Sequence, residues 1–271
     1  MLRMAGLRST DKAFSIVARA AYSWGMAKKA ARKSSGKKKQ ANQPKKTQTF
    51  LSRIRRWVMR GAVVVACVFL ALVLIYSVVN PPITHTIWSE WRRLGKVERD
   101  WVPIEEIAPV MARAVVAAED ANFCRHWGFD VNAIRDALED GGNRGASTIT
   151  QQVVKNVFLW QGRSWVRKAM ETALTPVVEI FWSKKRILEV YLNVAETGEG
   201  LFGVEAAARR NFGVSAAELS PVQAARLAAI LPAPRARSVT DPSVYTRRRA
   251  AAILDGAATI RADGRADCFE D

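Results

Sequence analysis

The chain has 271 residues, enough for one domain of ordinary size together with extensions. Its net charge of +17 comes almost entirely from one end: residues 1–60 contain 17 Lys/Arg and one acidic residue, a balance of +16, so residues 61–271 together carry +1. A main part this close to neutral disfavours a nucleic-acid-binding domain, whereas the basic end can contact anionic lipid head groups.

Residues 1–60 are predicted to form a basic, largely disordered cytoplasmic tail. Residues 1–25 are weakly amphipathic and basic, which is typical either of a helix on a membrane surface or of a translated leader upstream of a start at Met26; we favour the leader. Residues 28–48 are rich in Lys, Ser, Gln and Ala without an apolar period, a composition that does not build a packed core.

Residues 61–79 are predicted to be a transmembrane helix. The run has 19 residues without a charged side chain and would extend about 28 Å as a helix, against a hydrocarbon core of about 30 Å. Asn80-Pro81-Pro82 ends the helix where a signal peptide would carry a cleavage site. Arginines are concentrated just before the run, so the positive-inside rule places the tail in the cytoplasm and the rest of the chain on the opposite side of the membrane.

The part after this helix is predicted to be mostly α. Capping residues and apolar periods predict helices over 107–118, 130–139, 164–182, 183–193, 203–212, 220–231 and 245–260, and another that begins at Ser147 or Thr148. We divide it into a juxtamembrane linker (80–100), a compact domain (101–240) and a C-terminal helix with a polar end (241–271). Trp57, Trp88 and Trp91 are expected at the membrane interfaces.

Outside the basic tail, polar side chains are densest between two carboxylates, Glu119 and Glu171. The helix predicted over 107–118 delivers Glu119 at its C-terminal end, where the negative end of the macrodipole raises the pKa of a carboxylate and makes it a better base. Burial beside Phe123 and Trp127 would raise this pKa further. Acid/base chemistry at Glu119 is therefore the first functional hypothesis.

Four cations in the same stretch favour an anionic substrate group. They are Lys155, Arg163, Arg167 and Lys168. Fixed positive charge of this kind suits a phosphate-like group. On a helix that begins near Ser164, Arg167 and Lys168 precede Glu171 by four and three residues, so all three share one face.

Four blocks carry a family resemblance: residues 119–130, 145–156, 167–171 and 184–193. In this order they resemble the signature blocks of the peptidoglycan glycosyltransferases, over roughly residues 101–234. The resemblance implies a lysozyme-like domain behind one transmembrane helix. It also implies polymerisation of lipid II, the undecaprenyl-pyrophosphate-linked disaccharide-peptide, into glycan strands at the periplasmic face of the inner membrane.

The resemblance also implies roles for individual residues. Glu119 would be the general base that takes the proton of the acceptor's 4-hydroxyl, with inversion at the donor sugar, and Glu171 would be a supporting carboxylate. The four cations would hold the departing pyrophosphate. Sugar or phosphate oxygens would be positioned by Ser147, Thr148, Gln151 and Gln152. Structural support would come from Asp120, Phe123, His126 and Asn193.

No obligatory cofactor is expected. The chain has two histidines, and His85 lies outside every block, so no metal site is predicted; a divalent cation near the pyrophosphate stays an open alternative. The expected partners are lipid II, the growing glycan chain, membrane lipids and other proteins of cell-wall synthesis, but not nucleic acid.

Two other functions are alternatives to the glycosyltransferase. A membrane-bound lytic transglycosylase on the same fold also needs one Glu, but it needs no cations for a pyrophosphate. A non-catalytic scaffold of the cell-wall machinery would not need both carboxylates and all four cations. The glycosyltransferase is therefore favoured over both.

Two local features had open interpretations. A disulfide between Cys124 and Cys268 is chemically permitted outside the cytoplasm, but nothing in the sequence sets their distance, so Cys124 is expected to be a small packing residue. For the apolar run 157–160, the family resemblance implies a lip that dips into the bilayer, and ordinary core is the alternative.

Overall fold

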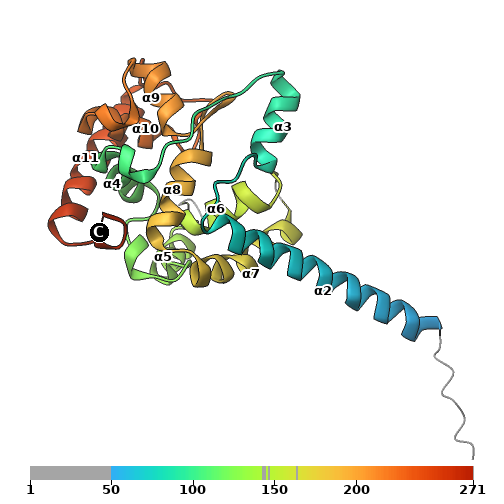
Figure 1. Cartoon of the computed structure of the whole chain (residues 1–271). Coiled ribbons are helices and arrows are strands. Elements are labelled where there is room, and N and C mark those ends of the chain that lie inside the picture. Colours follow the sequence, from blue (N-terminus) through green and yellow to red (C-terminus); the bar gives the residue numbers. More distant parts are fainter. Residues whose placement is uncertain (1–49, 142–144, 146, 163, 271) are drawn as a thin grey trace, which may run out of the picture. The chain divides into compact units, whose positions relative to one another are not determined.

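The computed structural model of the chain describes residues 50–141, 145, 147–162 and 164–270 (Figure 1). The chain divides into two compact units, Met1–Arg60 and Gly61–Asp271. The predictions made for residues 1–49, among them the alternative start at Met26, lie outside the described residues. All elements that bear on the site belong to the second unit.

Helix α2 (Phe50–Tyr76) contains the apolar run predicted to span a membrane, but its limits differ from 61–79. It begins within the arginine-rich segment, whose residues also favour helix, and it ends at Tyr76. Its stretch Ser52–Tyr76 is long and apolar enough to cross a membrane. Most side chains from Gly61 to Leu72 are exposed instead of packed against protein, as a lipid-facing helix requires.

The C-terminal end of α2 is attached to the rest of its unit. The indole Nε1 of Trp182 donates a hydrogen bond to the Val73 carbonyl at 2.8 Å. The Arg186 guanidinium donates to the carbonyls of Tyr76, at 3.0 Å, and Val79, at 2.8 Å. The carbonyl of Tyr76, the last residue of α2, is one that the end of a helix leaves without an intrahelical partner, whereas the Val73 carbonyl also accepts from the Ser77 N–H at 3.1 Å.

Helices make up most of the second unit, which confirms the mostly α prediction. In chain order they are α3 (His85–Leu94), η1 (Ile104–Glu106), α4 (Pro109–Glu119), η2 (Phe123–Arg125), α5 (Val131–Glu139), α6 (Ile149–Phe158), α7 (Trp165–Phe181), α8 (Lys184–Val194), α9 (Val204–Phe212), η3 (Ala216–Glu218), α10 (Pro221–Ile230), α11 (Val244–Ala262) and α12 (Asp267–Glu270). Helix α3 was not predicted and lies in the stretch assigned as linker.

Three short strands accompany these helices: β1 (Glu98–Arg99), β2 (Glu196–Gly198) and β3 (Leu201–Phe202). They form one sheet in the order β1-β3-β2, in which β1 is parallel and β2 antiparallel to β3. Strands of two or three residues are too short to show an alternating pattern, which is why the sequence did not predict them.

Local capping signals explain where the helices begin. Thr148 and Gln151 form a reciprocal capping box at the start of α6. Ser220 and Gln223 form another at α10, with Pro221 at the first helical position. These side chains satisfy backbone N–H groups that have no partner inside the helix. The predicted helix starts are therefore confirmed to within a residue or two.

Helix α4 lies in the centre of the core and carries Glu119 at its end. Its residues from Met111 to Val116 are buried, and α10 and α11 pack against it. The facing residues of α10 include several buried alanines, which permit close approach of the backbones. Because neighbouring helices surround α4, its C-terminal end has a fixed place beside α6 and α11.

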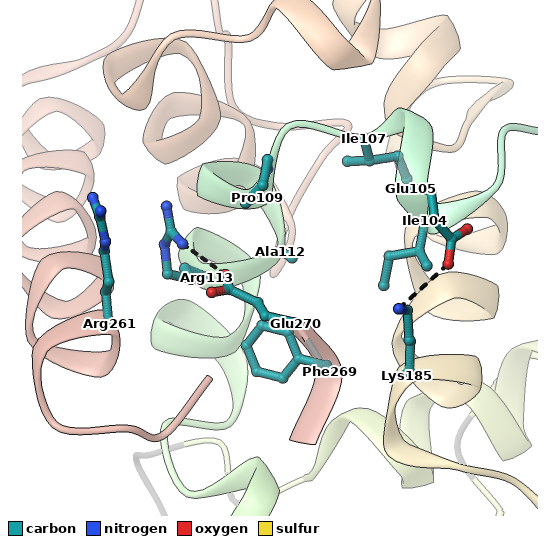
Figure 2. Close-up of a pocket in the computed structure, with 10 residues that line it drawn as sticks. All are labelled: Ile104, Glu105, Ile107, Pro109, Ala112, Arg113, Lys185, Arg261, Phe269 and Glu270. Atoms are coloured by element: carbon teal, nitrogen blue, oxygen red, sulfur yellow. Dashed lines mark hydrogen bonds and ion pairs between the residues drawn. The ribbon is translucent and has the colours of Figure 1, made fainter. Parts of the chain in front are cut away.

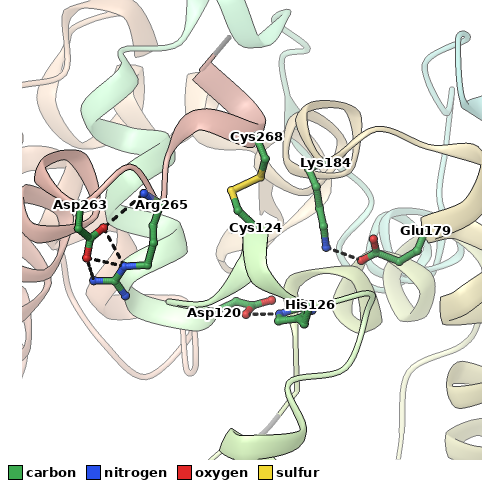
Figure 3. The surroundings of a disulfide bond; sticks show 8 residues. All are labelled: Asp120, Cys124, His126, Glu179, Lys184, Asp263, Arg265 and Cys268. Atoms are coloured by element: carbon green, nitrogen blue, oxygen red, sulfur yellow. Dashed lines mark hydrogen bonds and ion pairs between the residues drawn. A yellow bond between two sulfur atoms is a disulfide. The ribbon is translucent and has the colours of Figure 1, made fainter.

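The structure corrects the expectation for Cys124. It pairs with Cys268 in a disulfide across 144 residues, with a Cα–Cα distance of 5.6 Å (Figure 3). Helix α12 contacts η2 after a turn at Gly264, and this return of the chain brings the two cysteines together. The pairing depends on tertiary structure, so no local pattern could have indicated it.

Candidate active site

Glu119 is the last residue of α4, and its side chain is largely buried. Its Oε2 accepts a hydrogen bond of 2.9 Å from Nε2 of Gln152 on α6. Its Oε1 lies 3.7 Å from Nη2 of Arg249 on α11. Three helices thus meet at one carboxylate.

The environment raises the pKa of Glu119. Burial is the largest cause, because it penalises the charged form. The hydrogen bond from Gln152 and the charge of Arg249 lower the pKa and partly offset this effect. Trp127, which we expected to help bury the carboxylate, is 74% exposed, so this part of the prediction is wrong. Burial comes instead from the surrounding helices.

Two cavities share Gln152 as a lining residue. The first, of about 460 Å³, is lined by Glu119, Ser147 and residues of the C-terminal segment. The second, of about 380 Å³, is lined by Lys155 and Asn156 of α6 and by Thr86 and Ser89 of α3. The unpredicted helix α3 therefore forms a wall beside Lys155.

Lys155 is a largely buried cation on α6. Burial lowers its pKa, whereas the nearby carboxylates of Glu171 and Glu119 raise it. Within the described ranges, its ammonium group has no ion-pair partner within 4.0 Å. A buried charge without a close partner is costly, so this position favours an anionic ligand in the cavity.

Helix α7 presents two further cations beside Glu171. Arg167 Nη1 lies 2.6 Å from Glu171 Oε2, and Lys168 Nζ lies 2.5 Å from Glu171 Oε1. The predicted common face of these three residues is confirmed. Glu171 is buried with both oxygens occupied, so it orients the two cations. Arg163, the fourth predicted cation, lies outside the described residues.

The hydroxyl and amide residues predicted to bind substrate divide into two groups. Ser147 and Gln152 line the first cavity. Thr148 and Gln151 are buried, and their side chains bond to each other's backbone in the capping box. The Thr148 hydroxyl also donates to the Gly128 carbonyl at 2.7 Å. Thr148 also lines a smaller cavity together with Glu119 and Ser147. The substrate role of Thr148 and Gln151 stays a prediction.

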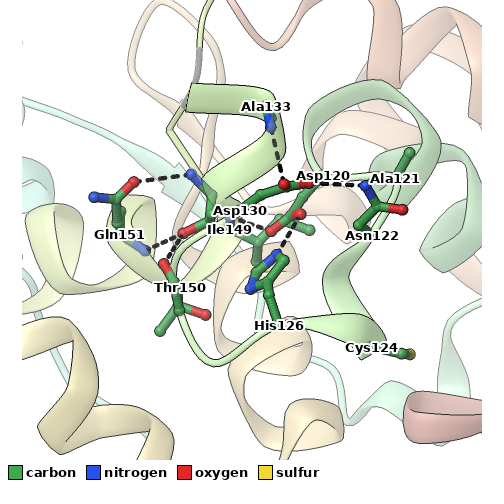
Figure 4. A network of polar contacts seen from close by, with 12 residues as sticks. Asp120, Ala121, Asn122, Cys124, His126, Asp130, Ala133, Ile149, Thr150 and Gln151 are labelled. Atoms are coloured by element: carbon green, nitrogen blue, oxygen red, sulfur yellow. Dashed lines mark hydrogen bonds and ion pairs between the residues drawn. The ribbon is translucent and has the colours of Figure 1, made fainter. Parts of the chain in front are cut away.

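Asp120 connects the first block to the start of α6 (Figure 4). Its Oδ1 lies 2.7 Å from His126 Nε2, and its Oδ2 accepts from the Ile149 N–H at 3.0 Å. Asp130 accepts from the Ala133 N–H at 2.9 Å and from Asn122 Nδ2 at 2.8 Å.

Asp120, His126 and Asp130 are close enough together to be considered as metal ligands, with ligand atoms within 4.8 Å of one another. Each of the four carboxylate oxygens already accepts a hydrogen bond from the protein, which an ion would have to displace. The arrangement therefore fits structural support better than metal binding.

Phe123 and Asn193, the other predicted supporting residues, are fully buried. The Phe123 ring lies beneath the Lys184 ammonium, whose Nζ is 4.4 Å from the ring centroid. Asn193 forms two hydrogen bonds with the Val102 backbone, accepting from N–H at 3.0 Å and donating to the carbonyl at 2.9 Å. Neither residue lines the two cavities.

The C-terminal segment supplies residues that the sequence did not indicate. Arg237, Tyr245 and Arg249 line the first cavity, and Arg249 donates to the Ala118 carbonyl at 3.2 Å. The run of arginines 247–249 was visible in the sequence. Its pattern does not show which of the three faces the site, because that depends on how α11 packs against α4.

The run 157–160 packs mainly inside the protein. Val157 and Leu159 are buried, and the Phe158 ring lies 4.9 Å from that of Phe69 on α2. The core interpretation is favoured for these residues. An exposed apolar surface is found instead at the start of α7, where Trp165 is 90% exposed.

Comparisons with known proteins agree on one family. The family model described as transglycosylase matches residues 86–258. A "Biosynthetic peptidoglycan transglycosylase" of Jannaschia sp. is 60% identical over 216 residues, which cover 80% of this chain and 90% of the relative. Proteins of the same name from Pseudomonas putida and Caulobacter vibrioides are 50% and 46% identical, over 74% and 72% of this chain and 86% and 87% of the relatives. The chain therefore belongs to the peptidoglycan transglycosylase family and is a glycosyltransferase enzyme.

Proposed function

We propose that the chain is a membrane-anchored enzyme that polymerises lipid II into glycan strands, with Glu119 as the general base. The observation that carries the proposal is the position of Glu119, a buried carboxylate of raised pKa that faces a cavity. The adjoining cavity is lined by Lys155, which has no ion-pair partner among the described residues. A base whose pKa is raised toward the working pH accepts a proton more readily than an ordinary carboxylate.

In this reaction Glu119 takes the proton of the acceptor's 4-hydroxyl as that oxygen attacks the anomeric carbon of the donor. The C–O bond to the lipid pyrophosphate breaks, and the configuration at that carbon inverts. The amide of Gln152 holds the carboxylate through its hydrogen bond to Oε2. The base is thereby oriented before the substrate arrives.

The departing pyrophosphate carries the negative charge that develops in the transition state. Lys155, Arg163, Arg167 and Lys168 are proposed to neutralise it, as positioned cations do in phosphoryl chemistry. Glu171 orients Arg167 and Lys168 through its two ion pairs. Because these pairs occupy both of its oxygens, Glu171 is a poor candidate ligand for a divalent cation at this place.

Helix α2 is proposed to anchor the enzyme, with the tail cytoplasmic and the catalytic domain in the periplasm. Basic residues concentrate before the apolar run. The Cys124–Cys268 disulfide supports the same orientation, since disulfides persist in oxidising compartments. We assign residues 101–240 to the catalytic domain and 241–271 to a C-terminal extension whose helix α11 lines the first cavity. The proposed partners are lipid II, the glycan chain and membrane lipids.

The test is incubation of the purified full-length protein in detergent with labelled lipid II. We expect a high-molecular-mass glycan product and release of undecaprenyl pyrophosphate. Intact glycan strands serve as the alternative substrate. Cleavage of these strands without polymerisation of lipid II would refute the proposal in favour of a lytic enzyme, and no reaction with either substrate would favour a scaffold.

A further inference from the structure

The last residues of the described chain form a structure that lies beyond the part matched by the family model, which ends at residue 258. We name residues 263–270 the C-terminal clasp. It consists of the turn after α11 and helix α12, and it returns to the segment that follows Glu119 (Figure 3).

The covalent contact of the clasp is the disulfide from Cys268 to Cys124 in η2. Next to it, the buried Phe269 ring packs against Phe123, with ring centroids 6.5 Å apart. Arg265 Nη1 also donates to the Ala121 carbonyl at 3.1 Å. The clasp therefore holds the stretch just after Glu119 by a covalent, an apolar and a polar contact.

A fourth contact of the clasp is made with α4, to a residue that precedes Glu119 in the chain. Glu270 Oε1 lies 2.7 Å from Nη1 of the buried Arg113 on α4 (Figure 2). Arg113 precedes Glu119 on the same helix, whereas Ala121 and Cys124 follow it. The clasp thus holds the chain on both sides of the carboxylate without touching the carboxylate itself.

The segment after Glu119 needs such external contacts. Asp120 leaves the helical conformation, with φ −160° and ψ 68°, and the chain continues in turns to η2. On the side of α6, the Asp120 carboxylate binds His126 and the Ile149 N–H. The backbone hydrogen bonds of this stretch are local, such as that from the Phe123 N–H to the Asp120 carbonyl at 2.9 Å, so contacts from either side help to set its position.

We propose that the C-terminal clasp is a positioning element of the active site, in which the Cys124–Cys268 disulfide fixes the chain around Glu119 so that its carboxylate keeps its place in the cavity. The proposal rests on the proposed role of Glu119 as base. The cations of α6 and α7 have no described contact with the clasp. Its loss should therefore affect the chemical step more than substrate binding, since a displacement of about 1 Å at a reacting group can cost on the order of 10²-fold in rate.

The experiment compares wild type with Cys124→Ser/Cys268→Ser, both as full-length protein in detergent, on labelled lipid II. We expect kcat to fall by about tenfold while KM stays within about twofold, at a temperature at which both proteins are folded by thermal melting. Ala208→Gly is the matched control, because it weakens a buried position of α9 outside the clasp. It should lower the melting temperature and leave kcat unchanged.

Reduction of the folded wild type is the second measurement. A dithiol reagent supplies two electrons and two protons, the disulfide becomes two thiols, and the reagent becomes a cyclic disulfide. The free thiols should rise from one, Cys67, to three. We expect the same loss of kcat and its recovery on reoxidation. Glu270→Gln, which keeps the disulfide but weakens the ion pair to Arg113, should reduce kcat about threefold with an unchanged KM.

The result that overturns the inference is a wild-type kcat in the double serine variant or, if that variant does not fold, in the reduced protein and in Glu270→Gln. A lower melting temperature with a normal kcat would show a disulfide that only stabilises the fold. The Glu119→Gln variant shows whether the clasp inference or the proposed role of Glu119 as base has failed. If Glu119→Gln is inactive while the clasp variants are fully active, the clasp inference fails alone; if Glu119→Gln is active, the role of the base fails.

Discussion

Replacing Gln152 by Leu tests how the structure sets the pKa of Glu119, the proposed base. The variant keeps the approximate size of the side chain but removes the donor that lies 2.9 Å from Glu119 Oε2. This hydrogen bond favours the charged carboxylate and so opposes the effect of burial. Without it, burial is less opposed and the pKa of Glu119 rises further.

The expected shift follows from the strength of such a bond. A hydrogen bond to a charged group contributes about 1.5–3 kcal/mol, and one pKa unit corresponds to about 1.36 kcal/mol, so the pKa of Glu119 should rise by about one to two units. The base works in its ionised form, so kcat/KM falls as the pH drops through this pKa. The acid limb of the profile should therefore move to higher pH by about one to two units.

The assay is the pH dependence of kcat/KM for lipid II polymerisation by wild type and Gln152→Leu. Tyr191→Phe is the matched control, because it removes the hydroxyl that lies 3.3 Å from Gln152 Oε1 but leaves the donor to Glu119 in place. Its acid limb should move by about half a unit or less. An unchanged acid limb in Gln152→Leu, or a shift to lower pH, would refute the reasoning.

Three further predictions concern the proposed pyrophosphate-binding cations, the fold and the topology. Lys155→Ala and Arg163→Ala should weaken both substrate binding and the single-turnover rate, with a loss of about 2–4 kcal/mol in transition-state stabilisation; wild-type behaviour would exclude these two residues from binding the pyrophosphate. Asn193→Ala should lower the free energy of unfolding by about 3 kcal/mol in urea titrations, because it leaves buried backbone groups without partners, and a change below about 1 kcal/mol would contradict this structural role. A reporter at the N-terminus should be cytoplasmic and one after Asp271 periplasmic, and the reverse labelling would overturn the orientation.

The sequence predicted features that local chemistry determines. Thr148 and Ser220 cap helices because their side chains accept hydrogen bonds from nearby backbone N–H groups. All residues of such a capping box lie within four consecutive positions, so the sequence alone shows it. The face shared by Arg167, Lys168 and Glu171 follows from helix geometry alone. The position of Glu119 at the end of its helix likewise follows from the local apolar run 107–118 that precedes it.

The features that the sequence did not predict depend on how distant segments pack. Arg249 reaches Glu119 from the far end of the chain, and its neighbours in sequence are also arginines. The disulfide joins cysteines 144 residues apart, and only the return of the chain after α11 brings them together. Trp127 was expected to help bury Glu119 but is exposed, and single exposed aromatic residues are common on protein surfaces.

Glu119→Gln tests the central claim most directly. Gln has almost the same size and shape as Glu and can still form hydrogen bonds, but its neutral amide does not take up a proton near neutral pH. The variant therefore removes only the base. Binding of lipid II and the single-turnover rate should be measured on the same preparations. We predict binding within about twofold of wild type and a rate lower by at least about 10²-fold. Polymerisation by Glu119→Gln at a rate comparable to wild type would contradict the assignment of Glu119 as the base.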